Sequence, residues 1–223
     1  MPLAFITGAN RGLGLEFTRQ YLQDGWRVIG CCRDPDAAHE LGNTGAEVMK
    51  LDVTQVADVT AASKRLAGTS IDLVVCNAGI AGARAPVLSP VTQVDFDQVM
   101  RTNVLGPMWI SAALADHLRP GGKIAYLSSQ MGSIGAMTNA GSALYRASKA
   151  ALNAVVKAVA LELASRDVTA IALHPGWVKT DMGGAGADID AATSVAAMRA
   201  VIERAGSRVS GHFFDYTGKE LPW

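Results

Sequence analysis

Seven short apolar runs, separated by segments with helical periodicity, restrict the fold of this chain more than any other feature. The runs cover residues 3–7, 26–32, 46–51, 71–76, 123–127, 168–173 and 212–215. The run at 71–76 is continuously apolar apart from one position, as expected of a strand buried on both faces of a parallel sheet. Strands that alternate with helices imply successive βαβ units. The sequence therefore predicts a doubly wound α/β fold, with about seven parallel strands and helices on both faces.

The intervening helices are expected over residues 15–22, 55–67, 94–119, 145–164 and 191–204. A short helix is expected after Pro35, residues 86–90 read as a loop, and the Pro-Gly-Gly sequence at 120–122 is expected to stop the long helix. The chain has 223 residues, of which 49% are hydrophobic, which is typical of one larger α/β domain. No repeat, low-complexity tract or linker divides the chain, so we expect residues 1–223 to form one domain.

Charge and cysteine usage argue against several classes of function. Twenty acidic and twenty basic residues balance, without the basic cluster of a protein that binds nucleic acid or a membrane surface. The cysteines, Cys31, Cys32 and Cys76, lack the spacing of a disulfide framework, which is typical of a reducing cytosol. No CxxC or HxxxH spacing suggests a metal site, and no apolar run reaches transmembrane length. Because no signal sequence precedes the first strand either, we expect a cytoplasmic protein.

A glycine-rich turn follows the first apolar run. It reads Gly8-Ala9-Asn10-Arg11-Gly12-Leu13-Gly14, and a helical pattern begins directly after it. In such a strand–turn–helix unit the glycines let the backbone approach a pyrophosphate, and the helix N-terminus offers free N–H groups. The alternative is a tight turn without a ligand. The spacing is Gly-x-x-x-Gly-x-Gly and not the commoner Gly-x-Gly-x-x-Gly dinucleotide fingerprint. This difference reduces the number of dinucleotide-binding families to which the chain could belong.

The end of the second apolar run bears on the choice of dinucleotide. An acidic residue at this place usually binds the ribose 2′-OH of NAD, whereas a nearby arginine accommodates the 2′-phosphate of NADP. Here Cys32 ends the run and Arg33 follows it, while the glycine loop contributes a second cation, Arg11. Two cations around one phosphate favour NADP(H) over NAD(H). Asp34 supports the opposite choice, because its carboxylate could reach the ribose instead.

Tyr145 and Lys149 are four residues apart in an expected helix, so their side chains share one face. A neighbouring ammonium favours phenolate, and we expect Lys149 to lower the pKa of Tyr145 from about 10. A pKa nearer to the operating pH makes a better acid–base catalyst. The alternative is an ordinary surface tyrosine and lysine, because the pattern fixes only two positions.

These motifs together resemble one family, the single-domain short-chain dehydrogenase/reductases, over essentially the whole chain. The matching pieces are Thr7-Gly8-x-x-x-Gly12-x-Gly14, Asn77-Ala78-Gly79, Asn103, Ser129, Tyr145-x-x-x-Lys149 and Pro175-Gly176. The residues around Ser129, Tyr145 and Val178, and the closing segment 218–223, are similar to the C-factor and sniffer-like carbonyl reductase branch. The resemblance implies a Rossmann fold and an NAD(P)-dependent oxidoreductase that transfers hydride between nicotinamide and a carbonyl or alcohol substrate.

The resemblance also implies a catalytic set of Asn103, Ser129, Tyr145 and Lys149. Tyr145 would be the acid or base, Lys149 would bind the nicotinamide ribose and assist Tyr145, and Asn103 would anchor a water that relays protons. Ser129 takes the catalytic place because Gly132 then falls where the family has its following glycine. The interval from this serine to the tyrosine is longer than in most members, so we infer an insertion within residues 136–143. Ser128 remains the alternative.

A cofactor site is implied in the same way. Its members would be Gly8, Asn10, Arg11, Gly12, Leu13, Gly14, Arg33, Asp52, Val53, Asn77, Ala78, Gly79, Tyr145, Lys149, Pro175, Gly176, Val178 and Thr180. The glycines would lie under the pyrophosphate, Asp52 and Val53 beside the adenine, and residues 175–180 beside the nicotinamide. The short, Gly- and Ala-rich segment 181–208 would be the substrate lid, and its small size favours a broad range of carbonyl substrates. Family members pair through the helices of Asn103 and Tyr145, so we expect a homodimer or homotetramer.

Two other functions are compatible with parts of the sequence. The C-factor resemblance allows a cofactor-binding signalling or regulatory protein with little turnover, although a pure binding module has no need of Tyr145. A sugar-nucleotide epimerase or dehydratase of the extended branch is disfavoured, because we recognise no additional C-terminal substrate domain in the sequence.

Overall fold

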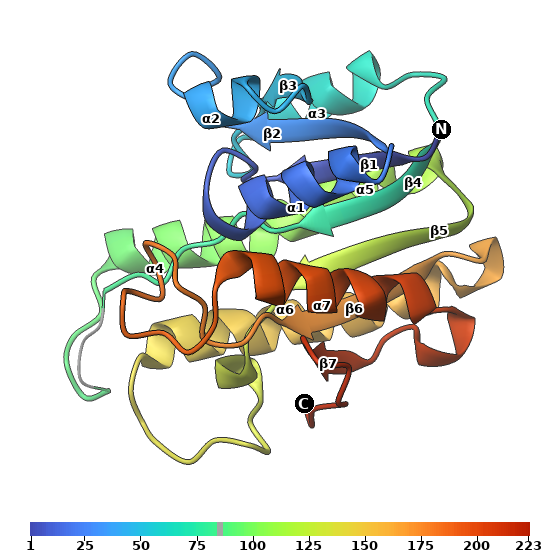
Figure 1. The fold of residues 1–223 in the computed structure, drawn as a ribbon. Coiled ribbons are helices and arrows are strands. Elements are labelled where there is room, and N and C mark those ends of the chain that lie inside the picture. Colours follow the sequence, from blue (N-terminus) through green and yellow to red (C-terminus); the bar gives the residue numbers. More distant parts are fainter. Residues whose placement is uncertain (84–86) are drawn as a thin grey trace.

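A seven-stranded parallel sheet forms the centre of the computed structural model, which describes residues 1–83 and 87–223 (Figure 1). The strands are β1 (Leu3–Thr7), β2 (Arg27–Cys32), β3 (Glu47–Lys50), β4 (Ile71–Cys76), β5 (Leu118–Leu127), β6 (Thr169–His174) and β7 (Phe213–Asp215). They lie in the order β3-β2-β1-β4-β5-β6-β7, and all neighbours are parallel. The order reverses direction between β1 and β4, and ligands of open α/β sheets bind outside the carboxyl ends of the strands at such a point.

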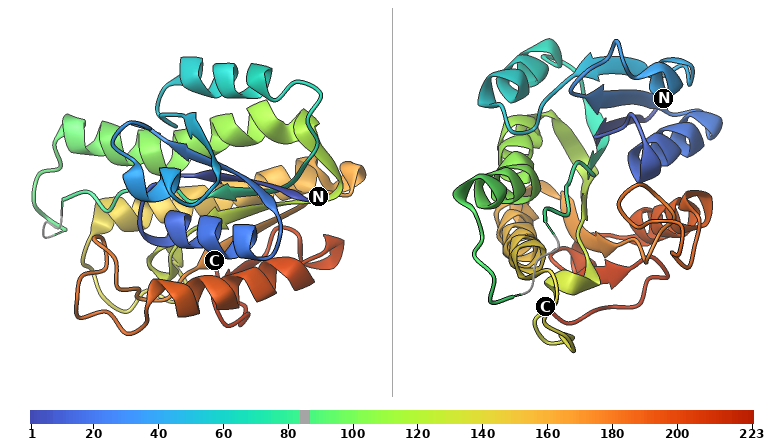
Figure 2. Two further views of the ribbon diagram at one scale, coloured as in Figure 1. Left: turned by 45° about the horizontal axis from the view of Figure 1, so that its top comes forward. Right: turned by 90° about the vertical axis from the view of Figure 1, so that its left-hand side faces the viewer.

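Helices cover both faces of the sheet (Figure 2). One layer contains α1 (Gly12–Gln23), α2 (His39–Gly42) and α7 (Ala191–Arg204), and the other contains α3 (Val56–Arg65), α4 (Gln93–Met100), α5 (Gly106–Leu114) and α6 (Ala143–Glu162). Alternate strand residues supply the two cores: Phe5 packs under the α3–α6 layer, whereas Ile6 packs under the α1–α7 layer. The doubly wound α/β fold expected from the sequence is confirmed.

The long helix expected over residues 94–119 differs from the structure. A π-helical turn, η1 (Arg101–Leu105), separates α4 from α5, and a short 3-10 helix, η2 (Ala115–His117), ends the segment. Strand β5 then begins at Leu118, which pairs with Ile71, and the register shifts before the next pair, Leu73 with Lys123. The prediction was wrong because Pro-Gly-Gly at 120–122 forms this irregularity within the strand and does not precede it.

The remaining elements agree with the sequence apart from small shifts at their ends. The helix that carries Tyr145 begins earlier than expected, at Ala143. Of the expected loop at 86–90, residue 86 lies outside the described residues, and 87–90 contain no helix or strand. No helix in the described part of the chain is long and apolar enough to cross a membrane.

Candidate active site

The predicted site residues gather where the parallel strands end. Gly8 follows β1, the segment from Asn77 to Gly79 follows β4, Ser129 follows β5 and Pro175 follows β6. Parallel strands bring these four ends to the same edge of the sheet. The site is therefore built from loops far apart in sequence, and α6 supplies Tyr145 and Lys149 from the layer beside them.

The backbone of the glycine loop adopts a conformation that disfavours side chains at its glycines. Gly8 and Gly12 have positive φ angles of 63° and 54°, which favour glycine. A Cβ atom on Gly14 would lie 2.2 Å from the carbonyl oxygen of Gly8, so α1 approaches the turn too closely for any other residue. No side chain caps the N-terminus of α1 at Arg11. Free amides at a helix N-terminus, beside a bare backbone, fit the pyrophosphate of a dinucleotide.

Thr7 and Asn77 hold this loop in shape. The side-chain amide nitrogen of Asn77 donates to the carbonyl oxygens of Thr7 and Gly8, each over 2.9 Å. The hydroxyl of Thr7 accepts from the backbone N–H groups of Asn77 and Ala78, at 3.0 and 3.1 Å. Asn77 thus connects the end of β4 to the glycine loop, in addition to any contact with a cofactor. Sequence reasoning gave Thr7 no role, and its place directly before Gly8 was the available signal.

Asn103 is fully buried within the π-helical turn. Its Nδ2 atom donates to the Ile80 carbonyl (2.8 Å) and to Ser148 Oγ (3.0 Å), and its Oδ1 atom accepts from the Ile80 N–H (2.9 Å). A Cβ atom on Gly79 would lie 3.4 Å from Asn103 Oδ1 and 3.6 Å from Lys149 Nζ. Asn103 therefore fastens the segment after β4 to α6, close to Lys149.

The two serines after β5 have different partners. Ser128 Oγ donates to Asn153 Oδ1 over 2.5 Å inside the core. Ser129 Oγ accepts from the Met131 N–H (3.1 Å), and its hydroxyl lies near enough to Tyr145 to lower the pKa of the phenol. The structure therefore brings Ser129, and not Ser128, to Tyr145.

Gly132 allows the segment after Ser129 to pack closely against the helix that carries Tyr145. It ends the 3-10 helix η3 (Gln130–Gly132), and a Cβ atom on it would lie 2.7 Å from the backbone carbon of Lys149. Only glycine permits η3 to pack this closely against α6. The packing brings the segment after Ser129 against the same part of α6 that carries Tyr145 and Lys149.

The expectation that Lys149 lowers the pKa of Tyr145 is wrong for this structure. Burial raises the pKa of Tyr145, and the neighbouring Ser129 hydroxyl only partly opposes it. Lys149 Nζ lies 5.7 Å from the centre of the Tyr145 ring and donates to the Leu127 carbonyl over 2.8 Å. Burial lowers the pKa of Lys149 to about 8. Desolvation penalises the charged form of each group, and it is the largest cause of both pKa shifts.

The cations expected near a 2′-phosphate differ in their surroundings. Arg33 is exposed, and within the described chain it forms no ion pair. The carboxylate of Asp34 instead accepts from the Ala37 N–H at 3.3 Å. Arg11 Nη1 contacts Asp181 Oδ2 at 2.7 Å in an exposed pair. Arg33 is thus the cation at this edge that no carboxylate neutralises.

The remaining predicted cofactor residues border the same edge. Asp52 Oδ1 accepts from the backbone and hydroxyl of Thr54, at 2.9 and 2.7 Å, and Val53 is buried against Gly106. Gly176 has a φ of 83°, and a Cβ atom on it would lie 2.9 Å from Ile189.

Residues 178–180 lead from the end of β6 back to the glycine loop. Val178 is buried and forms a β-bridge with Ile189. The Thr180 methyl group lies 3.5 Å from the Cβ position of Gly12. The segment after β6 therefore folds over the loop after β1.

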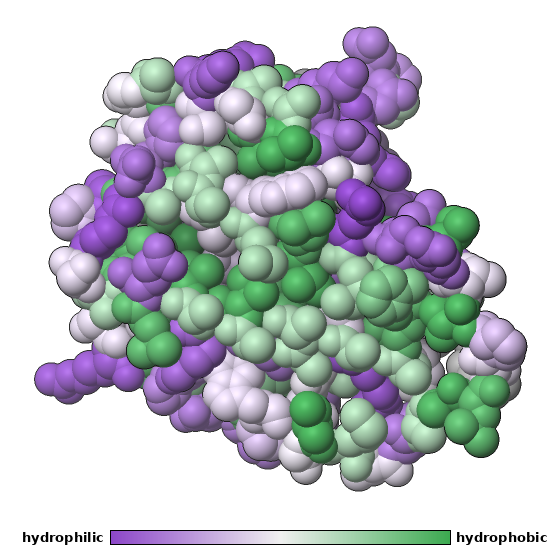
Figure 3. Space-filling model, turned by 180° about the vertical axis from the view of Figure 1, so that it is seen from behind, coloured by the Kyte–Doolittle hydropathy of each residue, from purple (hydrophilic) through white to green (hydrophobic). Residues whose placement is uncertain are grey.

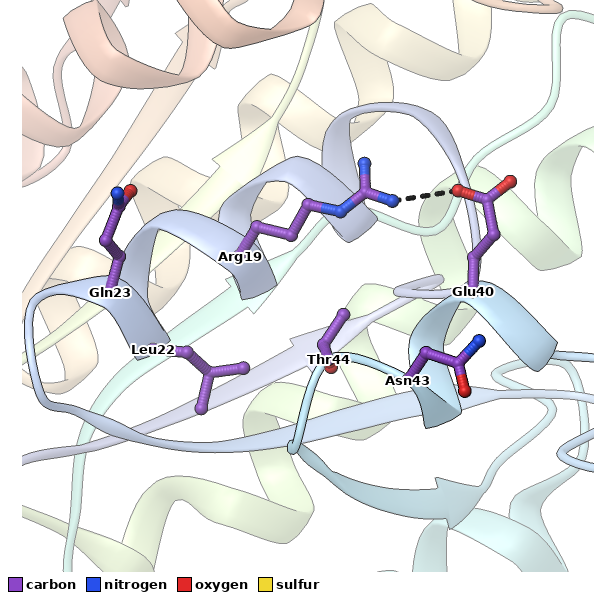
Figure 4. Close-up of a pocket in the computed structure, with 6 residues that line it drawn as sticks. All are labelled: Arg19, Leu22, Gln23, Glu40, Asn43 and Thr44. Carbon is purple, nitrogen blue, oxygen red and sulfur yellow. Dashed lines mark hydrogen bonds and ion pairs between the residues drawn. The ribbon is translucent and has the colours of Figure 1, made fainter.

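A separate hollow of about 630 Å³ lies between α1 and α2 (Figure 4). It is lined by Arg19, Leu22, Gln23, Glu40, Asn43 and Thr44, and an ion pair of 2.8 Å joins Arg19 to Glu40. It contains none of the predicted site residues. In the residues that the structure describes, no group of three His, Cys, Asp or Glu side chains could hold a metal ion.

Comparisons with known proteins identify the family of the chain. The family model for short chain dehydrogenases matches residues 2–188, and the chain belongs to this family. It is 40% identical over 155 residues to the C-signal protein of Myxococcus xanthus, which covers 69% of this chain and 93% of that protein. The family is one of NAD(P)-dependent oxidoreductases, and this chain is one of them.

Two solved structures superimpose on nearly the whole chain. Carbonyl reductase Sniffer of D. melanogaster has a TM-score of 0.93 and 29% identity, covering 100% of this chain and 99% of that one. A short-chain dehydrogenase/reductase from Burkholderia multivorans with bound NADP has a TM-score of 0.93 and 32% identity, with the same coverage. The likeness to the C-factor and sniffer-like branch is confirmed.

Proposed function

We propose that the protein is an NADP(H)-dependent carbonyl reductase with Tyr145 as the proton donor. The observation that carries this proposal is the Ser129 side chain beside Tyr145, next to the buried ammonium of Lys149, at the edge where the glycine loop lies. Carbonyl reductase Sniffer, a close structural match, supports the substrate class.

The chemistry follows from the charge that develops during reduction. Hydride transfer to a carbonyl carbon leaves negative charge on its oxygen, which is stabilised by donors that are already in place. Ser129 Oγ accepts from the backbone of η3, and its hydroxyl hydrogen would turn from Tyr145 to a substrate oxygen, while Tyr145 supplies the second donor and the proton. A bound NADPH supplies the hydride. Lys149 keeps a positive charge near Tyr145 at neutral pH, because its pKa of about 8 lies above 7.

A panel of small aldehydes, ketones and quinones tests the proposed activity through NADPH oxidation. We expect turnover of several members, because the segment expected to cover the substrate is short. Saturable binding of NADPH without turnover of any member would favour the signalling alternative, which the 40% identity to C-signal supports. Tight kinetics on a single steroid, with no other substrate, would contradict the broad specificity.

Arg33 is the residue on which the preference for NADP(H) should depend. Replacing Arg33 by alanine removes a charge-assisted contact to the 2′-phosphate, and we expect kcat/KM for NADPH to fall about 10- to 100-fold. The value for NADH should stay within about twofold, because NADH lacks this phosphate. Arg27→Ala, at the opposite end of β2, is the matched control and should leave both values unchanged. Equal losses with both cofactors would contradict the assignment.

The substrate lid is confined to the part of 181–208 that precedes α7. Four apolar residues of α7, namely Val195, Met198, Val201 and Ile202, are buried in the core beside α1. Arg199 also lies over the ring of Tyr21, at 4.4 Å from its centre. A helix fixed in this way is a structural layer, so residues 181–190 are the part that can open over a substrate.

The apolar face of α4, α5 and α6 supports assembly into a homodimer or homotetramer. Hydrophobic residues run across the middle of the side of the molecule that Figure 3 shows. The exposed apolar residues of these three helices include Phe96, Met108 and Leu161, which are 48%, 46% and 68% exposed. Exposed apolar area of this kind is typical of an interface. The double variant Phe96→Glu/Leu161→Glu should be monomeric in light scattering, whereas Val56→Glu on α3 should keep the assembly of the unmodified protein.

A cytoplasmic location is consistent with the cysteines. Cys31, Cys32 and Cys76 are all buried and free, and burial raises the thiol pKa of each one. Unpaired thiols of this kind suit a reducing compartment.

A further inference from the structure

A buried arginine next to Tyr145 takes no part in the chemistry proposed above. Arg146 is only 8% exposed, and no carboxylate of the described residues lies within ion-pairing distance of it. Burying a guanidinium without a counter-ion is costly unless other acceptors satisfy its N–H groups. The acceptors that replace a carboxylate therefore indicate what the residue does.

The guanidinium of Arg146 joins two separate segments. Its Nε donates to the Gly141 carbonyl and its Nη2 to Asn139 Oδ1, each over 2.7 Å, and both acceptors belong to the loop of residues 133–142. Its Nη1 donates to the Met131 carbonyl of η3 over 3.3 Å. The planar, forked guanidinium can reach three acceptors in different directions, which an ammonium at the end of a flexible chain cannot reproduce.

These contacts involve residues next to both hydroxyl-bearing residues of the site. The backbone N–H of Met131 donates to Ser129 Oγ, while the carbonyl of Met131 accepts from Arg146. Arg146 itself directly follows Tyr145 in α6. A single residue therefore links the position of Ser129 to the helix turn that carries Tyr145.

The loop of residues 133–142 ends in an unfavourable backbone conformation. Ser142 has φ 58° and ψ 46°, in the left-handed region that non-glycine residues rarely occupy. Such a conformation persists only where the surroundings impose it. Here Arg146 donates to Ser142 through its backbone N–H (2.9 Å) and to the adjacent Gly141 through its side chain. The arginine therefore holds the strained end of the loop.

The other end of this loop is anchored independently. Ser133 Oγ donates to the Pro222 carbonyl over 2.6 Å, and the Gly135 N–H donates to the Trp223 carbonyl over 3.0 Å. The Trp223 ring stacks on Phe213 of β7. One end of the loop is thus fixed to the sheet, and the hydrogen bonds of Arg146 join its other end and η3 to α6.

We propose that Arg146 is a positioning residue for the reduction: it sets Ser129 against Tyr145 and fixes the loop of residues 133–142 that joins them in the chain. This inference rests on the proposed function, because it assigns Ser129 and Tyr145 to a carbonyl oxygen. It predicts an effect on the carbonyl substrate that leaves cofactor binding unchanged, since the glycine loop and Arg33 have no contact with Arg146.

The test compares Arg146→Met and Arg146→Lys with the unmodified protein in NADPH binding, kcat and KM for a carbonyl of the panel. A small misplacement of catalytic groups can cost about 10²-fold, so we expect that loss of kcat/KM in Arg146→Met. Arg146→Lys keeps the charge but loses the planar, forked guanidinium, and its loss of kcat/KM should be intermediate, about 10-fold. Arg166→Met is the matched control, because the side chain of Arg166 donates to Asp116 and Ala115 near the far end of α6, and its kinetics should be unchanged.

Activity per NADPH-binding site separates positioning from a merely structural role. If kcat/KM per site in Arg146→Met equals that of the unmodified protein, the proposal is overturned, even where the melting temperature falls. Should Arg146→Met fail to fold, Arg146→Lys decides, and unaltered kinetics in that variant overturn the proposal.

Hydrogen exchange supplies a readout that does not need turnover. We expect the amides of residues 133–142 to exchange about 10-fold faster in Arg146→Met and at the unmodified rate in Arg166→Met. If the unmodified protein reduces no carbonyl of the panel, the proposed function fails. Unchanged exchange in Arg146→Met would separately refute the proposal that Arg146 fixes this loop.

Discussion

Replacing Tyr145 by phenylalanine is expected to lower kcat/KM for carbonyl reduction by a factor of about 10²–10⁴, the usual contribution of a general acid. The substitution removes the phenolic O–H, so the developing oxyanion loses one donor and its proton source. The ring remains against Lys149, whose contact is with the ring face, and binding of NADPH should change by no more than about twofold. Stopped-flow NADPH oxidation and fluorescence titration measure the two quantities.

Tyr21→Phe is the matched control for this substitution. Tyr21 is also buried, but it lies under α7, where Arg199 stacks on its ring, and burial raises its pKa to about 12. Loss of its hydroxyl should leave kcat/KM unchanged. Full activity in Tyr145→Phe would refute the proposed acid, and an equal loss in both variants would show that the effect is structural.

The pH dependence of the reaction should also reflect the role of Tyr145 as the acid. Burial raises the pKa of Tyr145, so the phenol keeps its proton throughout neutral pH and stays ready as an acid. The rate of reduction should therefore be flat through neutral pH and fall only in alkaline solution. For the reverse oxidation the phenolate is the active form, so that rate should rise with pH. Both dependences on the phenol should be absent from the residual activity of Tyr145→Phe.

Features encoded by contiguous residues could be predicted from the sequence. The apolar strands and the glycine loop could be recognised from local sequence patterns alone. At Gly14, for example, the close approach of α1 to Gly8 forbids a side chain, so this constraint is visible in the sequence as a glycine. The boundary at Leu118 could not be predicted, because pairing with Ile71 of another strand draws the residues before Pro-Gly-Gly into β5.

Within the site, the spacing of the residues left two questions open, and the tertiary structure answers both. The sequence favours Ser129 over Ser128 only through the place of Gly132, and it is the tertiary contacts, of Ser128 with Asn153 and of Ser129 with Tyr145, that separate the two. The same holds for the sign of the pKa shift at Tyr145. The i, i+4 spacing predicts proximity to Lys149 correctly, but the depth at which α6 is buried, which spacing does not encode, reverses the expected direction.

Replacing Lys149 by methionine should abolish most activity and yet stabilise the cofactor-free protein. Removing one charged donor from an active site typically costs about 10²–10³ in rate. Stability should change in the opposite direction, because burial lowers the pKa of Lys149 from 10.5 to about 8, and a shift of this size corresponds to about 3 kcal/mol of unfavourable burial of the charge. Loss of the hydrogen bond to Leu127 offsets about 1 kcal/mol. The net gain of about 2 kcal/mol should raise Tm by about 4–8 °C.

The dependence of this gain on pH identifies its cause. Between pH 8 and 10.5 the unfolded chain binds a proton at Lys149 that the folded chain does not, so the stability of the unmodified protein rises with pH across this window. The advantage of Lys149→Met should therefore be largest at pH 7 and shrink towards pH 10.5, as measured by urea unfolding at both values. Lys123→Met should show no such gain, because Lys123 Nζ is only partly buried and donates to two carbonyls at the end of α7. A Lys149→Met protein that is less stable than the unmodified one at pH 7 would contradict a costly buried charge. Together, lost turnover and gained stability would mean that the fold tolerates this ammonium for the sake of the reaction.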